Sequence, residues 1–312
     1  MTATRNVLTL GLVAGMLAGC GGPSTNPTGP SATTVAALHR ASGTNGDLLY
    51  VADEGGDPWG IDVTVLTYPQ GEPVSTISGI GPAWGICSDG SGNVWVVASS
   101  DNVYEFEHGG TTPIAQLKVP DTYLATGCAI DRNNGNLAVI NSGGPDGPSV
   151  DVWPHAEGSP VIYGGSAWSI AYDNKDNLFL NGGSSLYELA KGSNTFAALP
   201  INEPGDWPGG IQWDGKYVAM ETGGPNLKPR VYRVRVSGGA AKVVDTVYPV
   251  RMAKAAWFWI QDATIIATTS GGSKVRLWRY PKGDKATEVL SPFYGPWGIT
   301  VSVAPSHSRI RR

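Results

Sequence analysis

The segment Pro82-Ala83-Trp84-Gly85-Ile86-Cys87-Ser88-Asp89, followed by Gly92-Asn93-Val94-Trp95-Val96, contains the pattern that decides the fold. Its apolar centre recurs in further places along the chain: Thr126–Ala129, Trp168–Ala171, Gly209–Gln212, Trp257–Ile260 and Trp297–Thr300. The second residues of the six units, at positions 85, 127, 169, 210, 258 and 298, are spaced by 42, 42, 41, 48 and 40. A period of about 40 to 45 residues that contains only strand-like segments is typical of a β-propeller.

Each unit continues through a turn and three more strands. A polar turn such as 131–136 follows the first strand and predicts a tight hairpin, because Asp, Asn and Gly tolerate positive φ. We interpret these acidic turns as hairpins and not as calcium loops, since the Gly and terminal Glu of an EF-hand loop are missing. The second strand, as in Val94–Ser99, is apolar on both faces; the third, as in Val103–Glu107, alternates; an outer strand such as Ile114–Val119 completes the unit.

The two ends of the repeat region are incomplete in complementary ways. The chain enters at Asp47 with a second-type strand, Leu48–Asp53, and ends with a first-type strand, Trp297–Val303. Pairing these two fragments completes one blade and removes the exposed edges of an open array. The sequence therefore predicts an all-β, six-bladed propeller of four-stranded blades over residues 40–304, closed by the C-terminal inner strand.

The units resemble NHL repeats, whose pattern is Pro-x-Gly-Ile, an Asp turn, Gly-Asn and an apolar strand. Segments 82–96 and Gly295–Ile299 carry the resemblance, which implies the propeller fold and says little about function. In size and blade count the chain is also similar to senescence-marker and gluconolactonase-like propellers. That family holds a divalent ion with Glu, Asn and Asp at the starts of inner strands. Those residue types are absent from the corresponding starts here, so no catalytic residue is carried over.

Residues 1–20 have the pattern of an export signal. Arg5 precedes the apolar run Val7–Met16, which is too short to span a bilayer but has the length of a signal-peptide core. Leu17-Ala18-Gly19-Cys20 resembles the lipobox of bacterial lipoproteins, which implies removal of residues 1–19 and lipidation of Cys20. An ordinary signal peptide is the alternative. Residues 20–39, rich in Gly, Pro, Ser and Thr, predict a flexible tether. Gly21, in place of an inner-membrane-retaining Asp, favours the outer membrane or cell surface of a bacterial envelope.

Composition narrows the range of partners. The formal net charge is −4 and the only basic cluster is 309–312, within a tail at 305–312 that we expect to be disordered. The chain therefore has no electrostatic footprint for nucleic acid, and we expect a monomer whose membrane contact is the lipid. Cys87 and Cys128 lie one register apart in neighbouring units. Export permits a disulfide between them, but we favour two small buried apolar residues.

We expect a ligand site at the channel mouth, on the face where the inner strands begin and the second strands end. Aromatic residues at the strand starts are expected to stack on a small molecule, a glycan or a protein side chain, or else to plug the channel: Trp84, Tyr123, Trp168, Trp207, Trp257 and Trp297. Polar residues at the strand ends are candidates for a polar ligand or a divalent cation, or else cap strand ends: Asp53, Glu54, Asp101, Asn141, Asn181 and Glu221.

The favoured function is a non-enzymatic binding or scaffolding module that needs no cofactor or metal. His108 and His155 fall in turns on the far side from the expected mouth, and no nucleophile, acid and base set is recognisable. The alternative is a metal-dependent hydrolase, lactonase or lyase, in which the strand-end carboxylates bind a divalent cation such as Ca²⁺.

Overall fold

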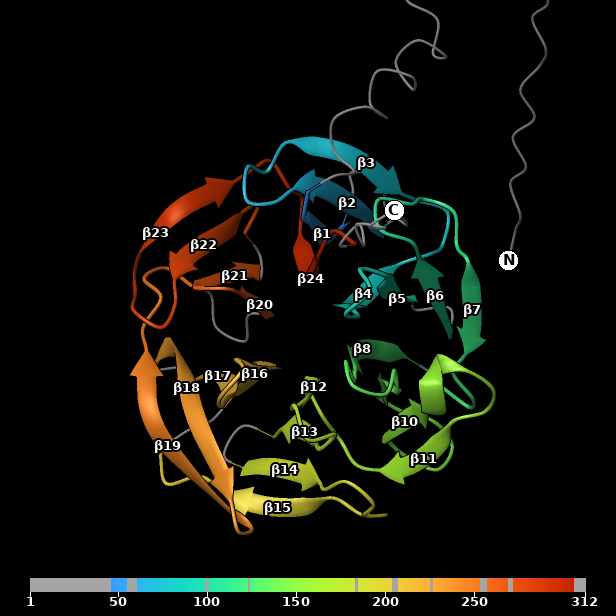
Figure 1. Ribbon diagram of the computed structural model, residues 1–312, viewed down its shortest axis with the longest axis vertical. Helices are drawn as coiled ribbons and strands as arrows, with labels where there is room; N and C mark the ends of the chain where they lie inside the picture. The colour runs from blue at the N-terminus through green and yellow to red at the C-terminus, as the bar shows by residue number, and fades with distance from the viewer. Residues whose placement is uncertain are drawn as a thin grey trace, which may run out of the picture. The chain divides into compact units, whose positions relative to one another are not determined.

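The computed structural model describes residues 46–54, 61–98, 101–122, 124–182, 185–203, 207–224, 227–252, 257–268 and 272–305. Six four-stranded antiparallel sheets surround a central channel, and the predicted six-bladed propeller is confirmed (Figure 1). One short 3₁₀ turn, η1 at Pro154–Ala156, is the only helical element in these ranges. None of the described helical structure has the length and apolarity needed to cross a membrane. The predicted signal peptide, Cys20, the tether, Tyr123 and residues 306–312 lie outside the described residues.

We label the blades A to F and give each from the channel outward. Blade A contains β24 (Pro296–Ser302), β1 (Leu48–Glu54), β2 (Ile61–Thr67) and β3 (Pro73–Ile77). Blade B contains β4 (Ala83–Ser88), β5 (Val94–Ala98), β6 (Asn102–Phe106) and β7 (Ala115–Lys118). Blade C contains β8 (Ala125–Ile130), β9 (Leu137–Asn141), β10 (Ser149–Trp153) and β11 (Val161–Gly164).

The second half of the ring repeats this order. Blade D contains β12 (Ile170–Tyr172), β13 (Leu178–Asn181), β14 (Ser185–Leu189) and β15 (Ala197–Pro200). Blade E contains β16 (Trp207–Trp213), β17 (Val218–Gly224), β18 (Leu227–Ser237) and β19 (Ala240–Val247). Blade F contains β20 (Phe258–Gln261), β21 (Thr264–Thr268), β22 (Val275–Arg279) and β23 (Gly283–Leu290).

The apolar core lies between the blades and not along the central axis. The second strands β5, β9 and β13 are buried at every residue, because both of their faces pack on neighbouring sheets. Buried apolar side chains form six clusters among the described residues, one at each junction between adjacent blades. At the junction of blades A and B, for example, Tyr50 and Val65 pack with Val96 and Phe106. The inner strands, which line the channel, present both polar and apolar side chains to it.

Strand β24 closes the ring as predicted. It pairs antiparallel with β1, and Tyr50 lies opposite Thr300 while Val51 lies opposite Ile299. Figure 1 shows β24 between β1 and the channel, so the C-terminal segment supplies the innermost strand of the first blade. His108 of blade B reinforces the junction. Its Nδ1 lies 2.6 Å from Ser302 Oγ and its Nε2 lies 3.1 Å from the carbonyl oxygen of Gly46.

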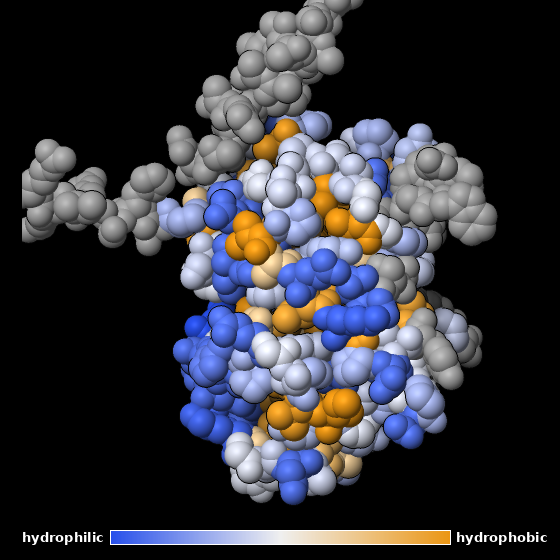
Figure 2. Space-filling model, turned by 90° about the vertical axis from the view of Figure 1, so that its right-hand side faces the viewer, coloured by the Kyte–Doolittle hydropathy of each residue, from blue (hydrophilic) through white to orange (hydrophobic). Residues whose placement is uncertain are grey.

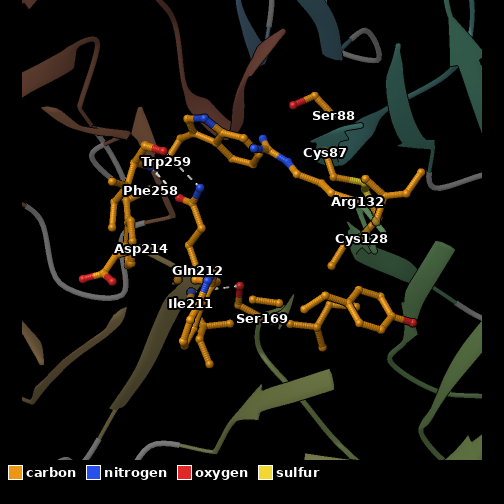
Figure 3. Close-up of a pocket in the computed structure, with 18 of the residues that line it drawn as sticks. Cys87, Ser88, Cys128, Arg132, Ser169, Ile211, Gln212, Asp214, Phe258 and Trp259 are labelled. Atoms are coloured by element: carbon orange, nitrogen blue, oxygen red, sulfur yellow. Dashed lines mark hydrogen bonds between the residues drawn. A yellow bond between two sulfur atoms is a disulfide. The ribbon is translucent and has the colours of Figure 1, made fainter. Parts of the chain in front are cut away.

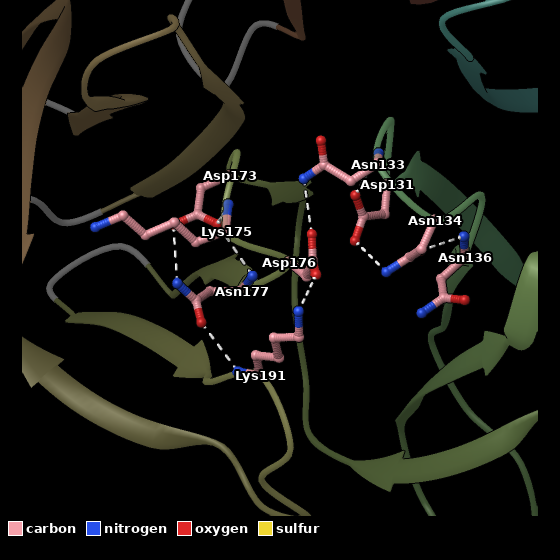
Figure 4. Close-up of polar contacts among 9 residues, drawn as sticks. All are labelled: Asp131, Asn133, Asn134, Asn136, Asp173, Lys175, Asp176, Asn177 and Lys191. Atoms are coloured by element: carbon pink, nitrogen blue, oxygen red, sulfur yellow. Dashed lines mark hydrogen bonds and ion pairs between the residues drawn. The ribbon is translucent and has the colours of Figure 1, made fainter.

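The acidic turns after the inner strands are hairpins, as the sequence predicted, and their aspartates also cap the turn backbone. In four blades the turn Asp accepts backbone N–H groups from its own turn at 2.7 to 3.0 Å, which satisfies donors left outside the strand ladder. The donors are Ser91 and Asn93 to Asp89, Asn133 to Asp131, Lys175 and Asn177 to Asp173, and Lys216 and Tyr217 to Asp214. Figure 4 shows the turns of blades C and D linked through Asn133 and Asp176, 2.7 Å apart.

The inner strands of blades A, B and C approach one another at glycines. A Cβ on Gly85 would lie 2.5 Å from the Cα of Gly127 and 2.8 Å from the carbonyl oxygen of Thr126. A Cβ on Gly298 would collide with the carbonyl oxygen of Trp84. A side chain at either glycine would push neighbouring backbones apart, so these glycines set the diameter of the channel on this side of the ring.

The expectation that Cys87 and Cys128 are unbonded was wrong. They form a disulfide between β4 and β8, with Cα atoms 5.8 Å apart. The physical reason is the close approach at Gly85 and Gly127, which brings the two inner strands within the range that a disulfide bridges. The offset of one register between Cys87 and Cys128 in the repeat is compatible with this disulfide.

The outer surface carries scattered apolar residues. Figure 2 shows hydrophobic patches separated by hydrophilic surface on the side of the propeller that it presents. Outer strands contribute exposed residues such as Ile162 of β11 and Val289 of β23. Separate patches of this kind are ordinary for a protein surface.

Candidate functional site

The predicted aromatic residues do not form one continuous ring among the described residues. Trp84 and Trp297, which begin the inner strands of blades B and A, contact edge to face with ring centroids 5.3 Å apart. Both rings are half-buried. Trp168 and Trp207, on neighbouring blades D and E, remain 43% and 47% exposed. The strand-start face therefore presents a packed pair on one side and two accessible indoles on the other.

Trp257 points into the channel and across it. A Cβ on Gly127 would lie 3.3 Å from Cη2 of Trp257, although Gly127 belongs to blade C and Trp257 to blade F, three blades away around the ring. The indole thus packs against the opposite inner strand. This is the plugging role that the sequence left open as an alternative for the aromatic set.

Blade E has no aromatic side chain at the equivalent position, because Gly209 stands there. The carboxylate of Glu221 occupies the space that a Gly209 side chain would fill. Glu221 is completely buried, and its backbone carbonyl oxygen accepts a hydrogen bond from Asn181 Nδ2 at 2.9 Å. The same Asn181 amide donates to the carbonyl oxygen of Gly209 at 3.0 Å. Asn181 therefore ties blade D to blade E through backbone atoms.

The other strand-end polar residues also contact backbone or rim groups. Asp53 Oδ1 accepts the backbone N–H groups of Tyr294 and Gly295 at 2.9 and 2.8 Å. Asn141 donates to the carbonyl oxygen of Pro120 at 3.2 Å and accepts the N–H of Gly143 at 3.3 Å. These contacts order the loops beside the inner strands.

Two members of the polar set are not placed at the channel. Asp101 lies 3.5 Å from Lys118 Nζ of the outer strand β7, at the rim of blade B. The side chain of Glu54 lies outside the described residues. In the part of the chain that the structure describes, no three His, Cys, Asp or Glu side chains gather as a metal site requires.

A cavity lies in the opposite half of the channel, where the inner strands end and their hairpin turns begin. Its volume is about 520 Å³, and all six blades line it. Of the predicted mouth residues whose side chains the structure describes, only Trp257 contributes to its wall, at the cavity's inner end. A volume in the range of about 300 to 1,000 Å³ is usual for small-molecule sites.

Arg132 and Trp259 meet in this cavity. Figure 3 shows Arg132 extending from the turn after β8 towards Trp259 of β20. The guanidinium carbon lies 5.8 Å from the centroid of the Trp259 ring, a cation–π distance. Surrounding protein lowers the pKa of the guanidinium by desolvation, and the charge of Asp89 partly opposes this. Arginine nevertheless stays protonated at neutral pH.

The other polar side chains of the cavity serve the fold. Gln212 Nε2 donates to the carbonyl oxygen of Ile260 at 3.1 Å, and its Oε1 accepts the Ile260 N–H, so it joins blades E and F (Figure 3). Ser169 Oγ accepts the N–H of Ile211 at 3.2 Å and joins blades D and E. Each of these side chains forms hydrogen bonds with backbone groups of the next blade, as a neighbouring strand would.

Asp214 at the rim is held by a charge network. Burial raises its pKa, but hydrogen bonds from Tyr280, from the Tyr217 backbone and from Arg233 outweigh burial and leave the pKa below its usual value. The Arg233 Nε to Asp214 Oδ2 distance is 2.9 Å, and the Tyr280 hydroxyl donates to the same oxygen at 2.7 Å. Asp214 is therefore ionised and paired.

Sequence reasoning missed Arg132 and Trp259. One signal was present, because Arg132 is the only basic residue that directly follows the turn aspartate of an inner hairpin; the residues at that place elsewhere are Gly90, Asn174, Gly215 and Ala263. The pairing with Trp259 had no local signal, since the two residues come from blades on opposite sides of the channel.

The fold and the channel define the chain as a six-bladed β-propeller. No protein-family model matches the sequence, and no curated protein matches it. Solved structures do match in fold. A chain of a nidogen/laminin complex has a TM-score of 0.61 at 13% identity, with 83% of this chain and 99% of that chain covered. Apo AztD from Citrobacter koseri has a TM-score of 0.53 at 11% identity, covering 82% and 98%. A second Citrobacter koseri AztD structure gives 0.51 at 12%, covering 82% and 97%. Identities this low show the fold alone.

Proposed function

We propose that this protein is a non-enzymatic binding module held at the bacterial cell envelope, which uses the strand-start face of its propeller to bind a glycan or another flat ligand. The lipobox-like Leu17-Ala18-Gly19-Cys20 supports the anchoring, with lipid on Cys20 and the tether 20–39 giving the propeller its reach. The outer membrane or the cell surface is the proposed location.

The observation that carries the binding role is the exposure of Trp168 and Trp207. They stand at the same end of neighbouring inner strands and are 43% and 47% exposed, whereas Trp84 and Trp297 are half-buried and contact each other. Two accessible indoles on a rigid ring suit the apolar face of a sugar or a partner's side chain, because stacking needs a fixed flat surface. A glycan is the first class to test.

The strand-end polar groups support a non-enzymatic role over the hydrolase alternative. Asp53, Asn141 and Asn181 are engaged with backbone groups of their own and neighbouring blades. A carboxylate that accepts two N–H groups has fewer lone pairs to offer a divalent cation. The alternative would need a different ligand set.

Calorimetric titration with soluble peptidoglycan fragments tests the binding role. We expect binding that weakens at least about tenfold when both exposed indoles are removed in Trp168→Ala/Trp207→Ala. The control Ile114→Ala/Ile162→Ala removes exposed apolar surface from the outer rim and should bind as the natural chain does. Equal binding by the two double variants would contradict the role. A bound divalent ion found by elemental analysis, with metal-dependent turnover of a lactone, would establish the hydrolase instead.

The anchoring is tested separately. Cells fed a clickable fatty acid should label the natural chain and leave Cys20→Ser unlabelled, and the variant should leave the membrane fraction. Equal labelling of both chains would remove the lipid anchor from the proposal without affecting the binding role.

A further inference from the structure

The cavity at the turn side of the channel has a wall that is part apolar and part polar. Each of the six blades contributes an isoleucine, such as Ile86 and Ile299, and the indole of Trp257 lies at the cavity's inner end. Among the described residues that line it, Arg132 is the only one with a basic side chain. An apolar pocket with a small number of fixed polar groups is the usual construction of a small-molecule site.

The Arg132 guanidinium keeps its hydrogen-bonding capacity. Among the described residues no carboxylate lies within ion-pair distance of it, although Asp214 of the same cavity is paired with Arg233. Its cation–π contact with Trp259 uses none of its five N–H donors. Arg132 is open to solvent through the cavity and is still surrounded by enough protein to lower its pKa. A guanidinium placed in this way binds a carboxylate more strongly than one on an open surface.

We propose that this cavity binds a small organic monocarboxylate with a flat apolar body, whose carboxylate pairs with Arg132 and whose body packs on Trp259. This site lies at the opposite end of the channel from Trp168 and Trp207, so it is additional to the proposed envelope-binding function.

The rim charges set the class of anion. Asp173, Asp214 and Asp262 line the same cavity, and Asp262 is exposed. Their negative charges oppose a nucleotide or another polyanion more strongly than an anion that carries a single charge, which pairs with Arg132. The bidentate fork of the guanidinium matches a planar carboxylate, and the indole of Trp259 lies beside it within cation–π distance.

Titration calorimetry with 2-naphthoate, on the full chain purified in detergent, tests the site. We expect saturable binding, with 2-naphthamide and 2-naphthylmethylammonium at least about tenfold weaker, equal to about 1.4 kcal/mol. Arg132→Met should weaken 2-naphthoate by at least about tenfold and remove the preference for the acid over the amide. Arg132→Lys keeps the positive charge but loses the bidentate geometry of the guanidinium. Its affinity for 2-naphthoate should lie between those of the natural chain and Arg132→Met.

Lys175→Met is the matched control. It removes one positive charge from an exposed turn of the neighbouring blade outside the cavity, and it should bind 2-naphthoate as the natural chain does. Circular dichroism and a melting curve of Arg132→Met establish that the variant is folded. If folded Arg132→Met binds 2-naphthoate as tightly as the natural chain, the inference is wrong.

Two further outcomes would also overturn it. One is the absence of binding for 2-naphthoate, benzoate and indole-3-acetate at millimolar concentration. The other is equal affinity for acid and amide in the natural chain. Loss of 2-naphthoate binding in Trp168→Ala/Trp207→Ala, together with normal binding in Arg132→Met, would move the ligand to the strand-start face and leave the proposed function intact.

Discussion

The carboxylate of Asp53 accepts the backbone N–H of Gly295 at 2.8 Å, across 242 residues of sequence. It also accepts the N–H of Tyr294, so one side chain on β1 holds the loop that leads into β24. Because β24 completes the first blade, this contact belongs to the closure of the ring. Asp53, which the sequence predicted as a candidate ligand, therefore stabilises the position of the C-terminal strand.

Asp53→Ala should destabilise the propeller. It leaves two backbone donors beside a buried site without their acceptor, at an expected loss of about 1 to 3 kcal/mol in the free energy of unfolding. Asp62→Ala, at the position opposite Asp53 on β2, is the matched control and should change stability by less than about 0.5 kcal/mol. Urea unfolding followed by tryptophan fluorescence measures both. Similar losses in the free energy of unfolding in the two variants would contradict the role of Asp53 in holding the C-terminal strand.

Gly85→Ala should be much more disruptive than Gly90→Ala. The added methyl at Gly85 would meet the backbone of β8 at 2.5 and 2.8 Å, while nothing lies within 4 Å of the equivalent point at Gly90. We expect Gly85→Ala to lower the free energy of unfolding by about 1 to 3 kcal/mol or more, since backbone cannot yield as a side chain tip does. Thermal melts compare the two, and equal midpoints would show that the inner strands are free to spread.

Reduction of the Cys87–Cys128 disulfide should lower stability. The bond closes a loop across a sequence separation of 41 residues, and loop-closure entropy alone gives about 4 kcal/mol. Unfolding of the natural chain in the presence of dithiothreitol should resemble that of Cys87→Ser/Cys128→Ser, which should itself be indifferent to dithiothreitol. Reaction of Cys87 and Cys128 with a thiol reagent in the denatured, unreduced chain would contradict the bond.

His108 should make stability fall as the medium becomes acidic. Burial lowers the pKa of its imidazole, and the hydrogen bond to Gly46 and the charge of Asp47 only partly oppose this. The unfolded chain therefore takes up the proton more readily than the folded one. The stability that depends on neutral His108 is complete above the ordinary pKa of about 6.5 and declines as the pH falls through it towards the folded value.

Urea midpoints of the natural chain and of His108→Asn between pH 5 and 8 measure this effect. The difference between the two chains should change across the window in the direction of greater acid sensitivity for the natural chain. Parallel pH profiles would assign the acid sensitivity to other groups.

The blades were predictable because their signals are local. The 42-residue period, the alternation in Val103–Glu107 and the turn at Asp89 each follow from a few neighbouring residues. Ring closure was also predictable, because an unmatched second strand at Leu48 and an unmatched first strand at Trp297 each need the other. The relation to NHL-repeat propellers, drawn from the repeat pattern, and the export of the chain, drawn from the lipobox-like segment, are still predictions.

For the candidate site, the sequence supplied residue types and strand positions but not the contacts that each side chain makes. The sequence placed polar residues at the strand ends as candidate ligands. Asn141 and Asn181 instead donate hydrogen bonds to backbone carbonyl groups, which only the folded ring brings near them. The sequence also placed the mouth at the strand starts. The cavity opens at the other end, where Arg132 lies, since Trp257 fills the space beside Gly127.

The amino-acid sequence by itself determined the number of blades, the order of strands within each and the hairpin turns after the inner strands, because these depend on contacts between residues close in the chain. Tertiary structure alone decided which side chains meet across the channel, such as Arg132 with Trp259, and which neighbouring strands approach closely enough for the Cys87–Cys128 bond. Those distances depend on the accumulated twist and spacing of six stacked sheets, which no single repeat encodes.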